Sequence, residues 1–252
     1  MKLVFKRHIG LFGLLLCSLT SCFAGEPSPP DFAAIQDVKE RKAKFFAYLE
    51  PLASQVNAKV LEDRSRLLAI AESKGAMSWW DRRFVAQLAD RYRVDPGDLD
   101  TLLRRVDVVP ISLLLAQAAN ESNWGRSRFA TKGKALFGQW CFKPGCGMVP
   151  KGRPEGQTYE VRAFDTYRDS IRAYVHNLNT GDAYLDLRLL REQERNRLAA
   201  PQGLKLASGL SSYSTRREEY VKEIQSMIRF NKLDRFDDMA SGCSHTELDH
   251  RC

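Results

Sequence analysis

The chain has no hydrophobic run long enough to cross a membrane, and it contains few histidines. The apolar run from Ile9 to Leu19 is shorter than the roughly 20 residues that a transmembrane helix needs. Histidine occurs only four times in 252 residues, and no histidine has a companion motif for a serine or cysteine nucleophile. These absences argue against a membrane-spanning protein and against an enzyme of the Ser-His or Cys-His type.

The first residues have the pattern of a secretory signal, because basic residues precede the short apolar run. The run ends in Leu19-Thr20-Ser21-Cys22, which resembles the lipobox of bacterial lipoproteins. In a lipobox the cysteine becomes the lipidated first residue, so we expect removal of residues 1–21 and a lipid on Cys22. The protein would then be exported to the periplasmic side of the envelope and anchored to the outer membrane. Ordinary cleavage after Ala24, without a lipid, is the alternative.

Cysteine is also scarce, with six residues in the whole chain. Four of them lie beyond residue 22, namely Cys141, Cys146, Cys243 and Cys252. An even number in an oxidising compartment predicts two local disulfides, Cys141 with Cys146 and Cys243 with Cys252. A zinc site at the first pair is the alternative, but no second cysteine or histidine pair lies at a suitable spacing. We therefore expect neither a metal nor another cofactor.

The composition is that of an ordinary globular protein, with 44% hydrophobic and 28% charged residues. It excludes a disordered, a collagen-like and a multi-span membrane protein. Lys and Arg total 39 against 31 Asp and Glu, and removal of residues 1–21 takes away three of the basic residues. The small remaining surplus of positive charge argues against nucleic acid as a partner.

Apolar spacing predicts helices through the first half of the chain. Between residues 31 and 106 the hydrophobic residues recur at helical intervals, and Pro51 and Gly75 are expected to separate the helices. Ser78 is a predicted N-cap. Pro110 is expected to open the next helix, because a missing N–H is tolerated in the first turn.

The pattern changes between residues 138 and 163, where glycine and proline are frequent. The alternation of Tyr159 and Val161 with polar neighbours predicts a short strand or hairpin there. Further helices are expected to follow. Thr166 with Asp169 and Thr215 with Glu218 have the spacing of capping boxes, so we expect two helices to begin there, the second being the last of the chain.

These patterns divide the chain into five predicted parts. They are a signal segment at 1–21, a proline-rich tether at 22–30, a helical N-terminal extension at 31–85, a main domain at 86–236 and a cysteine-containing tail at 237–252. The fold class we expect is mainly α, with a small β-lobe inside the main domain.

The segment from Ile111 to Gly125 places a carboxyl group at the end of a strongly apolar helix. Glu121 shares a stripe with Ala118, Gln117 and Leu114, three, four and seven residues earlier. Partial burial there raises the pKa of a carboxyl group and keeps it protonated near neutral pH, as a general acid requires. The alternative is a glutamate that leaves the apolar face for solvent at a helix end.

Four sequence blocks resemble a known enzyme family. They are Ala-Gln-Ala-Ala-Asn-Glu-Ser-Asn-Trp-Gly at 116–125, Leu-Phe-Gly at 136–138, Phe-Asp-Thr-Tyr-Arg-Asp-Ser-Ile at 164–171, and Ser-Tyr-Ser-Thr at 212–215 with Tyr220. Their order is that of glycoside hydrolase family 73, the bacterial N-acetylglucosaminidases that cut peptidoglycan. In the second block Ala135 stands where the family usually has asparagine.

The resemblance implies a lysozyme-like helical fold and a reaction. Glu121 would protonate the leaving oxygen of the β-1,4 bond after N-acetylglucosamine. A second carboxylate or the substrate's own acetamido group must stabilise the oxocarbenium-like transition state. Glu155, and as the alternative Glu160, lie on the segment where the family's β-lobe acid would fall.

Other residues of the blocks have implied binding roles. Tyr213 would contact the acetamido group or hold a water near the anomeric carbon. Trp124 is expected either to form the floor of a sugar subsite or to pack in the core, and Phe137 and Gly138 to shape the cleft. The implied partner is the glycan strand of peptidoglycan, whose peptide stems carry carboxylates that a mildly basic surface attracts.

Two other functions fit the same residues. A catalytically idle envelope lipoprotein could bind glycan or a protein partner through the cleft, and Ala135 and the unplaced second acid favour it. A lytic transglycosylase would also use a single glutamate and would form an anhydro product without a water nucleophile.

Overall fold

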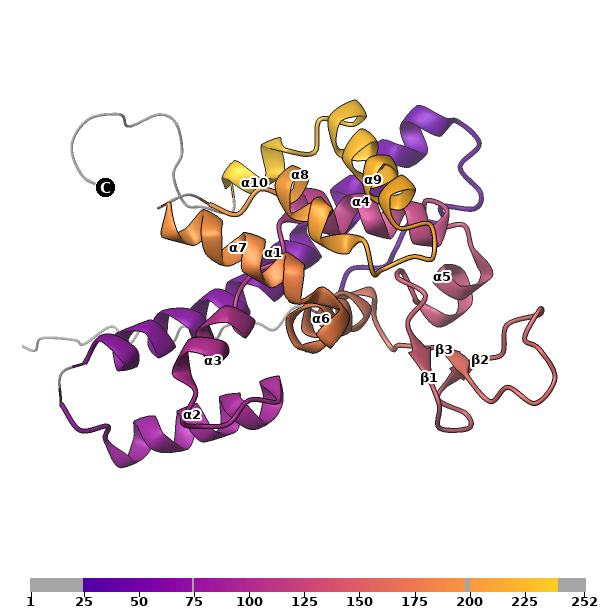
Figure 1. Cartoon of the computed structure of the whole chain (residues 1–252). Coiled ribbons are helices and arrows are strands. Elements are labelled where there is room, and N and C mark those ends of the chain that lie inside the picture. The colour runs from indigo at the N-terminus through magenta and orange to yellow at the C-terminus, as the bar shows by residue number, and fades with distance from the viewer. Residues whose placement is uncertain (1–24, 74, 198–199, 240–252) are drawn as a thin grey trace, which may run out of the picture.

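The computed structural model describes residues 25–73, 75–197 and 200–239. Within these residues the chain is mainly helical, with one small antiparallel sheet (Figure 1). This confirms the expected fold class. The helices are α1 (Val38–Glu72), α2 (Trp79–Tyr92), α3 (Leu99–Arg105), α4 (Ile111–Ser122), α5 (Arg128–Gly133), α6 (Tyr167–Thr180), α7 (Leu185–Asn196), α8 (Gly203–Leu206), α9 (Glu218–Phe230) and α10 (Arg235–Met239). Two short 3-10 turns, Asp182–Tyr184 and Ala207–Leu210, precede α7 and follow α8.

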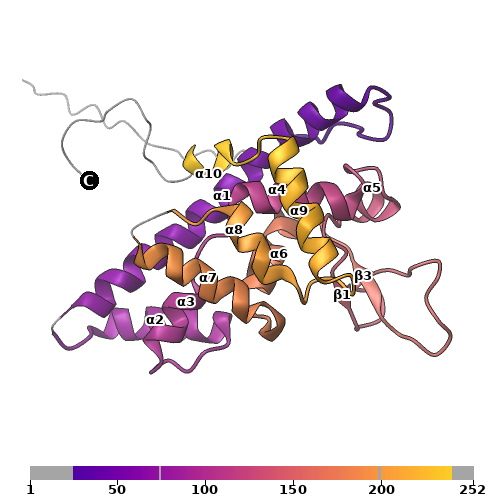
Figure 2. The same ribbon diagram turned by 45° about the horizontal axis from the view of Figure 1, so that its top comes forward.

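Helix α1 is 35 residues long and runs along the whole body of the molecule (Figures 1 and 2). Asp37 caps it by accepting a hydrogen bond from the N–H of Glu40. The prediction that Pro51 separates two helices is wrong, because α1 continues through it. Buried side chains on both sides of the proline, such as Leu49 and Leu52, pack into the core, and this packing outweighs the lost backbone hydrogen bond.

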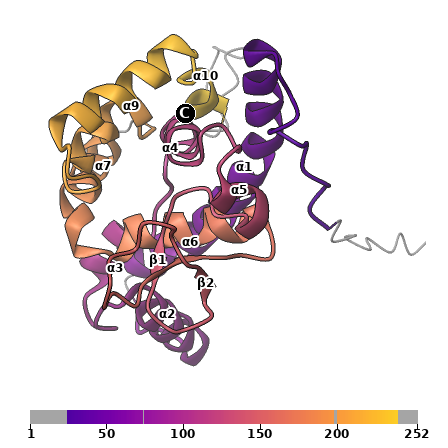
Figure 3. The ribbon, with the colours of Figure 1, turned by 90° about the vertical axis from the view of Figure 1, so that its right-hand side faces the viewer.

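Helix α4 is the centre of the fold. Figure 3 shows it between α1 on one side and α9 on the other, and it contacts both helices. Nearly all of its side chains are buried, as its apolar sequence requires. The helix begins after Pro110, as predicted, but Pro110 offers no side chain to cap it. Asp237 of α10 does so instead, accepting hydrogen bonds from the N–H and the hydroxyl of Ser112.

The sheet has the strand order β1-β3-β2, with β1 at Trp140–Cys141, β2 at Gly147–Met148 and β3 at Glu160–Arg162. Both pairs are antiparallel, and Val161 faces Trp140 on one side and Met148 on the other. The short strand predicted around Val161 is thus confirmed. The connection between β2 and β3 projects away from the helices (Figures 1 and 2).

The two predicted capping boxes have different outcomes. Thr166 caps α6 by accepting a hydrogen bond from the N–H of Asp169, and its own hydroxyl donates to the Asp169 carboxylate. At the second box the prediction is wrong, because α9 follows Arg217 without a side-chain cap. Arg217 has a φ of 44°, so the chain turns sharply after Thr215 and the helix begins beyond the turn. Helix α10 then follows α9, which is therefore not the last helix.

The residues before α1 contact the body of the protein. Phe32 is only 2% exposed and packs edge to face against Phe45 of α1. The carboxylate of Glu26 accepts hydrogen bonds from the N–H groups of Tyr167 and Arg168 at the start of α6. The predicted tether thus touches the body from Glu26 onward, while the domain boundaries drawn from the sequence stay predictions.

None of the helices in the described part of the chain combines the length and the apolar character of a membrane span. Cys22, Cys243 and Cys252 lie outside the described residues, so the predicted lipidation and the second predicted disulfide concern parts that the structure does not describe.

Candidate active site

Glu121 lies in the last turn of α4, at the point where the chain leaves the core. Directly after the helix the chain turns through three consecutive residues with a positive φ: 50° at Asn123, 58° at Trp124 and 76° at Gly125. A side chain at Gly125 would meet the ring of Phe32, since its Cβ would lie 2.5 Å from the Phe32 Cδ2 atom. The turn therefore requires glycine at this position, and it fixes the direction in which α4 presents Glu121.

A line of buried hydrogen bonds holds one oxygen of Glu121. The hydroxyl of Tyr220 donates to Glu121 Oε1 at 2.8 Å. Gln117 Nε2 donates to the Tyr220 hydroxyl at 2.8 Å, and the hydroxyl of Tyr174 donates to Gln117 Oε1. Because Gln117 supplies a proton to the Tyr220 oxygen, the proton of Tyr220 itself is directed at Glu121. The line runs across three helices, α6, α4 and α9.

The second carboxylate oxygen of Glu121 is left for another partner. Oε1 also lies 3.5 Å from Asn120 Nδ2. Within the described residues no hydrogen bond or ion pair is made by Oε2. A proton on Glu121 is therefore best placed on Oε2, because Oε1 is occupied by the donor from Tyr220.

Burial raises the pKa of Glu121 above its ordinary value. The hydrogen bonds from Tyr220 and Asn120 and the positive charge of Arg216 act in the opposite direction, and the negative charge of Glu223 adds to the effect of burial. Arg216 and Glu223 form an ion pair at 2.6 Å. The predicted desolvation of Glu121 is thus present in the structure.

Tyr213 belongs to the same group of residues. Its ring stacks on Tyr220 with 5.3 Å between centroids, and its hydroxyl donates to the carbonyl oxygen of Phe137 at 3.3 Å. Burial raises the pKa of Tyr213 well above its ordinary value, so the side chain is neutral at physiological pH. A hollow of about 660 Å³ lies against Tyr213 in the turn between residues 211 and 218.

Phe137 and Gly138 complete this group. The Phe137 ring stacks on Tyr174 with 3.9 Å between centroids and is buried. Gly138 follows with a φ of 62°, which turns the chain from the core toward the β-lobe. The structure therefore brings together the predicted residues Glu121, Tyr213, Phe137 and Gly138.

Trp124 lies on the other side of the turn that ends α4. Its ring packs edge to face against Phe45 and Phe46 of α1, with centroids 5.8 Å and 5.5 Å away. Lys42 Nζ lies 4.6 Å from the centre of a Trp124 ring. These contacts correspond to the packing role that the sequence left open beside the role in a sugar subsite.

The two candidates for the second carboxylate lie in different surroundings. Glu160, in β3, is buried and accepts hydrogen bonds from the N–H groups of Gly145 at 3.0 Å and Gly147 at 2.8 Å. These bonds lower the pKa of Glu160. Glu155 is exposed in the connection between β2 and β3, and its carboxylate makes no hydrogen bond or ion pair within the described residues. Among the described residues, no hydrogen bond or ion pair joins either carboxylate to Glu121.

Cys141 and Cys146 form the first predicted disulfide, with their Cα atoms 6.2 Å apart. Glu160 lies beside them, so the three side chains have the spacing of a metal site. Disulfide sulfurs are not thiolates, however, and both oxygens of Glu160 already accept backbone hydrogen bonds. This donor set does not fit a metal ion.

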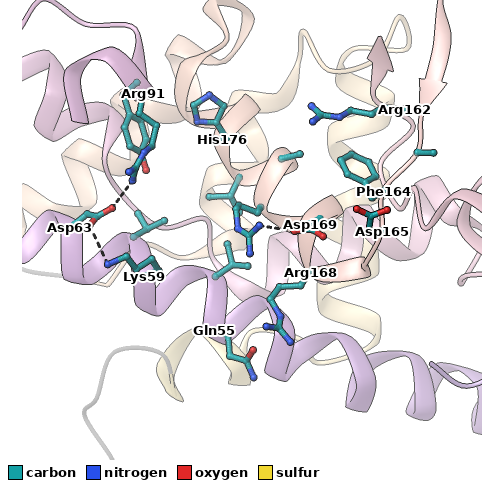
Figure 4. A pocket seen from close by; sticks show the side chains of 17 residues that line it. Gln55, Lys59, Asp63, Arg91, Arg162, Phe164, Asp165, Arg168, Asp169 and His176 are labelled. Atoms are coloured by element: carbon teal, nitrogen blue, oxygen red, sulfur yellow. Dashed lines mark hydrogen bonds and ion pairs between the residues drawn. The ribbon is translucent and has the colours of Figure 1, made fainter. Parts of the chain in front are cut away.

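A hollow of about 740 Å³ lies elsewhere, between α1, α2 and α6 (Figure 4). Asp63 lies between Lys59 and Arg91 and is paired with both, and Asp169 is paired with Arg172. Asp63 and Asp169 are thus neutralised by bases, and none of the residues around Glu121 lines this hollow.

Sequence reasoning missed the roles of three residues in the site. Tyr220 belongs to a recognised block without an assigned role, Gln117 is only a member of the Glu121 stripe, and Tyr174 has no role from the sequence at all. Gln117 carried a usable signal, because a polar side chain on an otherwise apolar helix face must find hydrogen-bond partners when it is buried. Its partners, on α6 and α9, lie too far away in the sequence to be named from spacing.

A half-buried carboxyl group of raised pKa has the properties that a general acid needs in glycoside hydrolysis. Residues 98–233 match the Glucosaminidase family model, described as mannosyl-glycoprotein endo-beta-N-acetylglucosaminidase, and the chain belongs to this family. The resemblance seen in the four sequence blocks is thereby confirmed.

Similar proteins include one curated relative and two solved structures. Protein bax of Escherichia coli (strain K12) is 31% identical over 215 residues, which cover 83% of this chain and 76% of that protein. A peptidoglycan hydrolase from Sphingomonas sp. A1 is 24% identical, with a TM-score of 0.38 over 66% of this chain and 93% of the other. The catalytic domain of the autolysin Auto from Listeria monocytogenes is 18% identical, with a TM-score of 0.39 over 67% and 93%.

Proposed function

We propose that the protein is a peptidoglycan hydrolase, an endo-β-N-acetylglucosaminidase that cleaves the β-1,4 bond after N-acetylglucosamine, with Glu121 as its general acid. Membership of the glucosaminidase family supports the reaction. The signal-like first residues support a substrate in the bacterial envelope. The observation that carries the proposal is the carboxyl group of Glu121, which is half-buried, raised in pKa and held at one oxygen only.

The asymmetry of the Glu121 hydrogen bonds gives each oxygen a task. Oε2 carries the proton and gives it to the glycosidic oxygen as the bond to the anomeric carbon breaks. The proton on Tyr220 stays directed at Oε1, because Gln117 holds the Tyr220 oxygen from the other side. Tyr220 thus stabilises the carboxylate that forms, and a water molecule completes the hydrolysis.

Tyr213 is proposed to contact the acetamido group of the sugar whose bond is cleaved. Its neutral hydroxyl donates its proton to the Phe137 carbonyl oxygen and can still accept a hydrogen bond from the acetamido N–H, and its ring is fixed by stacking on Tyr220. Phe137 and Gly138 would shape the neighbouring wall of the cleft. Trp124 would hold the turn after Glu121 in place through its contacts with α1.

For the second carboxylate we propose Glu155 in preference to Glu160. Both oxygens of Glu160 are used by backbone N–H groups, whereas Glu155 is exposed and unpaired within the described residues. Replacing Glu155 with Gln should lower kcat about 100-fold, and Glu160→Gln serves as the comparison. A Glu155→Gln enzyme with unchanged kcat would assign the task to the substrate's acetamido group instead.

The location of the protein is part of the proposal. We propose that Cys22 is lipidated and anchors the protein at the outer membrane, on the periplasmic side. The mass of the processed chain, isolated from cells, tests this. A chain that begins at Cys22 with added acyl chains supports the anchor, and an unmodified chain that begins after Ala24 contradicts it.

The products formed from peptidoglycan test the reaction. The chain without residues 1–21 is incubated with purified peptidoglycan, and the new ends are identified by mass spectrometry after borohydride reduction. Reducing N-acetylglucosamine ends are expected. Anhydro-muramic ends would show a lytic transglycosylase, and an absence of new ends over a range of pH and salt would favour a glycan-binding or partner-activated protein.

A further inference from the structure

The β-lobe carries large aromatic side chains on its surface. Trp140 in β1 is 59% exposed, and Phe142, two residues later, is 68% exposed. The Trp140 ring stacks almost parallel on Tyr159, with 4.3 Å between centroids and 16° between ring planes. Single exposed aromatic residues are common. A stacked pair of rings with a further exposed aromatic residue nearby in the sequence is a surface suited to binding.

The part of the chain that carries Trp140 is held at several points. The disulfide between Cys141 and Cys146 closes the loop that follows Trp140, and Glu160 fixes the same loop through the N–H groups of Gly145 and Gly147. On the Tyr159 side, Arg153 Nη1 donates to the Tyr159 carbonyl oxygen at 3.2 Å. Rings mounted in this way lose little conformational freedom when they bind a ligand.

Trp140 also follows shortly after a residue of the proposed site of cleavage in the sequence. The carbonyl oxygen of Phe137 accepts the hydrogen bond from Tyr213. Trp140 is three residues further on, so its Cα lies at most about 11 Å from that of Phe137. A polymeric strand that passes Glu121 and Tyr213 can therefore reach the β-lobe with sugars that are not being cleaved.

We propose that Trp140, supported by Tyr159, is a stacking platform for a pyranose ring of the glycan strand, and this rests on the proposed function. The face of a β-linked pyranose presents C–H groups, and the negative face of an aromatic ring attracts them. The platform would form a subsite away from the scissile bond. It would give the enzyme affinity for long strands without taking part in the reaction.

Binding to glycan in the absence of turnover tests the platform. The chain without residues 1–21 carries Glu121→Gln, so that the strand is not cut, and the probe is a purified peptidoglycan glycan strand freed of its peptides. Adding Trp140→Ala should raise Kd about tenfold, as loss of an aromatic anchor does at other binding surfaces. Trp140→Leu should have a similar effect, while Trp140→Phe, which keeps an aromatic ring, should retain most of the affinity.

The matched control is Trp80→Ala, since Trp80 is 70% exposed on α2 and belongs to neither site. It should leave Kd unchanged, and all variants should unfold at the temperature of the parent. Equal Kd values for the Trp140→Ala, Trp140→Leu and parent chains would overturn the platform, as would a parent that does not bind the strand. The end groups released by the unsubstituted protein decide the proposed function separately, because that measurement does not depend on Trp140.

Discussion

Glu121 is exposed to two opposing influences on its pKa. Burial disfavours the carboxylate, and the hydrogen bond from Tyr220 favours it. Burial is the larger influence, so the pKa is raised, while the hydrogen bond keeps it from rising further. A general acid needs this balance, because it must hold a proton before the bond breaks and release it during the step.

Tyr220→Phe removes the donor and should raise the pKa of Glu121. A general acid works in its protonated form, so the fall in kcat at high pH should move to higher pH in this variant. Stability should decrease by about 1 kcal/mol, because Gln117 Nε2 loses its buried partner. A pH–rate profile measures the shift. Tyr184→Phe is the control, since no hydrogen bond joins Tyr184 to Glu121, and equal profiles for the Tyr220→Phe enzyme and the parent would contradict this role of Tyr220.

Glu121→Gln should make the protein more stable at neutral pH but not in acid. The folded pKa of Glu121 lies above its ordinary value of 4.5, so the parent loses stability as the pH rises from about that value through the folded pKa. Glutamine does not ionise and can still accept the hydrogen bond from Tyr220. Thermal unfolding at a series of pH values should show a gain in Tm that grows from pH 4 toward pH 7. A gain that is independent of pH would mean that ionisation of Glu121 does not oppose folding.

The ends of the helices explain how the site residues are held. Helix α4 has no capping side chain at Pro110, and Asp237, which lies 125 residues after Ser112 in the sequence, caps it instead. The same carboxylate accepts a hydrogen bond from the N–H of Gly203 at the start of α8. The Glu26 carboxylate likewise accepts hydrogen bonds from two backbone N–H groups at the start of α6. Residues from both ends of the described chain therefore cap the first turns of the helices that carry Glu121 and Tyr174.

Asp237→Ala should destabilise the protein by about 3 kcal/mol, because it leaves the N–H groups of Ser112 and Gly203 without their buried acceptor. Urea unfolding followed by circular dichroism gives the change in free energy. Asp234→Ala, at an exposed position three residues earlier, is the matched control and should change stability by less than about 0.5 kcal/mol. Similar losses in the two variants would show that Asp237 has no special part in capping α4.

Elements whose signals are local could be predicted from the sequence. The capping box at Thr166 and the N-cap at Ser78 form as expected, because each needs only residues within one turn. Pro51 and Thr215 misled the prediction because tertiary packing decides the outcome there: the core holds α1 together through the proline, and a turn at Arg217 delays α9. Long-range caps such as Asp237 have no local pattern that would reveal them.

On the scale of the whole molecule, the site is assembled from distant parts of the chain. The motif blocks and their order were enough to predict the family. They also predicted that Glu121, Tyr213 and Phe137 belong to one site, and the structure places them together. The packing of Phe32 and α1 around the turn after α4 was not foreseen, because contacts between helices far apart in the sequence leave no periodic signal. The sequence predicts helix α1 to be part of an N-terminal extension, but in the structure it shares a hydrophobic core with α4.

The rate at which reducing N-acetylglucosamine ends are released from purified peptidoglycan, measured for the parent and for Glu121→Gln, tests the central claim most directly. The variant should be folded, as shown by its circular dichroism spectrum and its binding to glycan, because glutamine fits the space of glutamate. Its rate should fall by about 1,000-fold, since glutamine has no proton to give. A folded Glu121→Gln protein that releases these ends at the parental rate would contradict the assignment of Glu121 as the general acid.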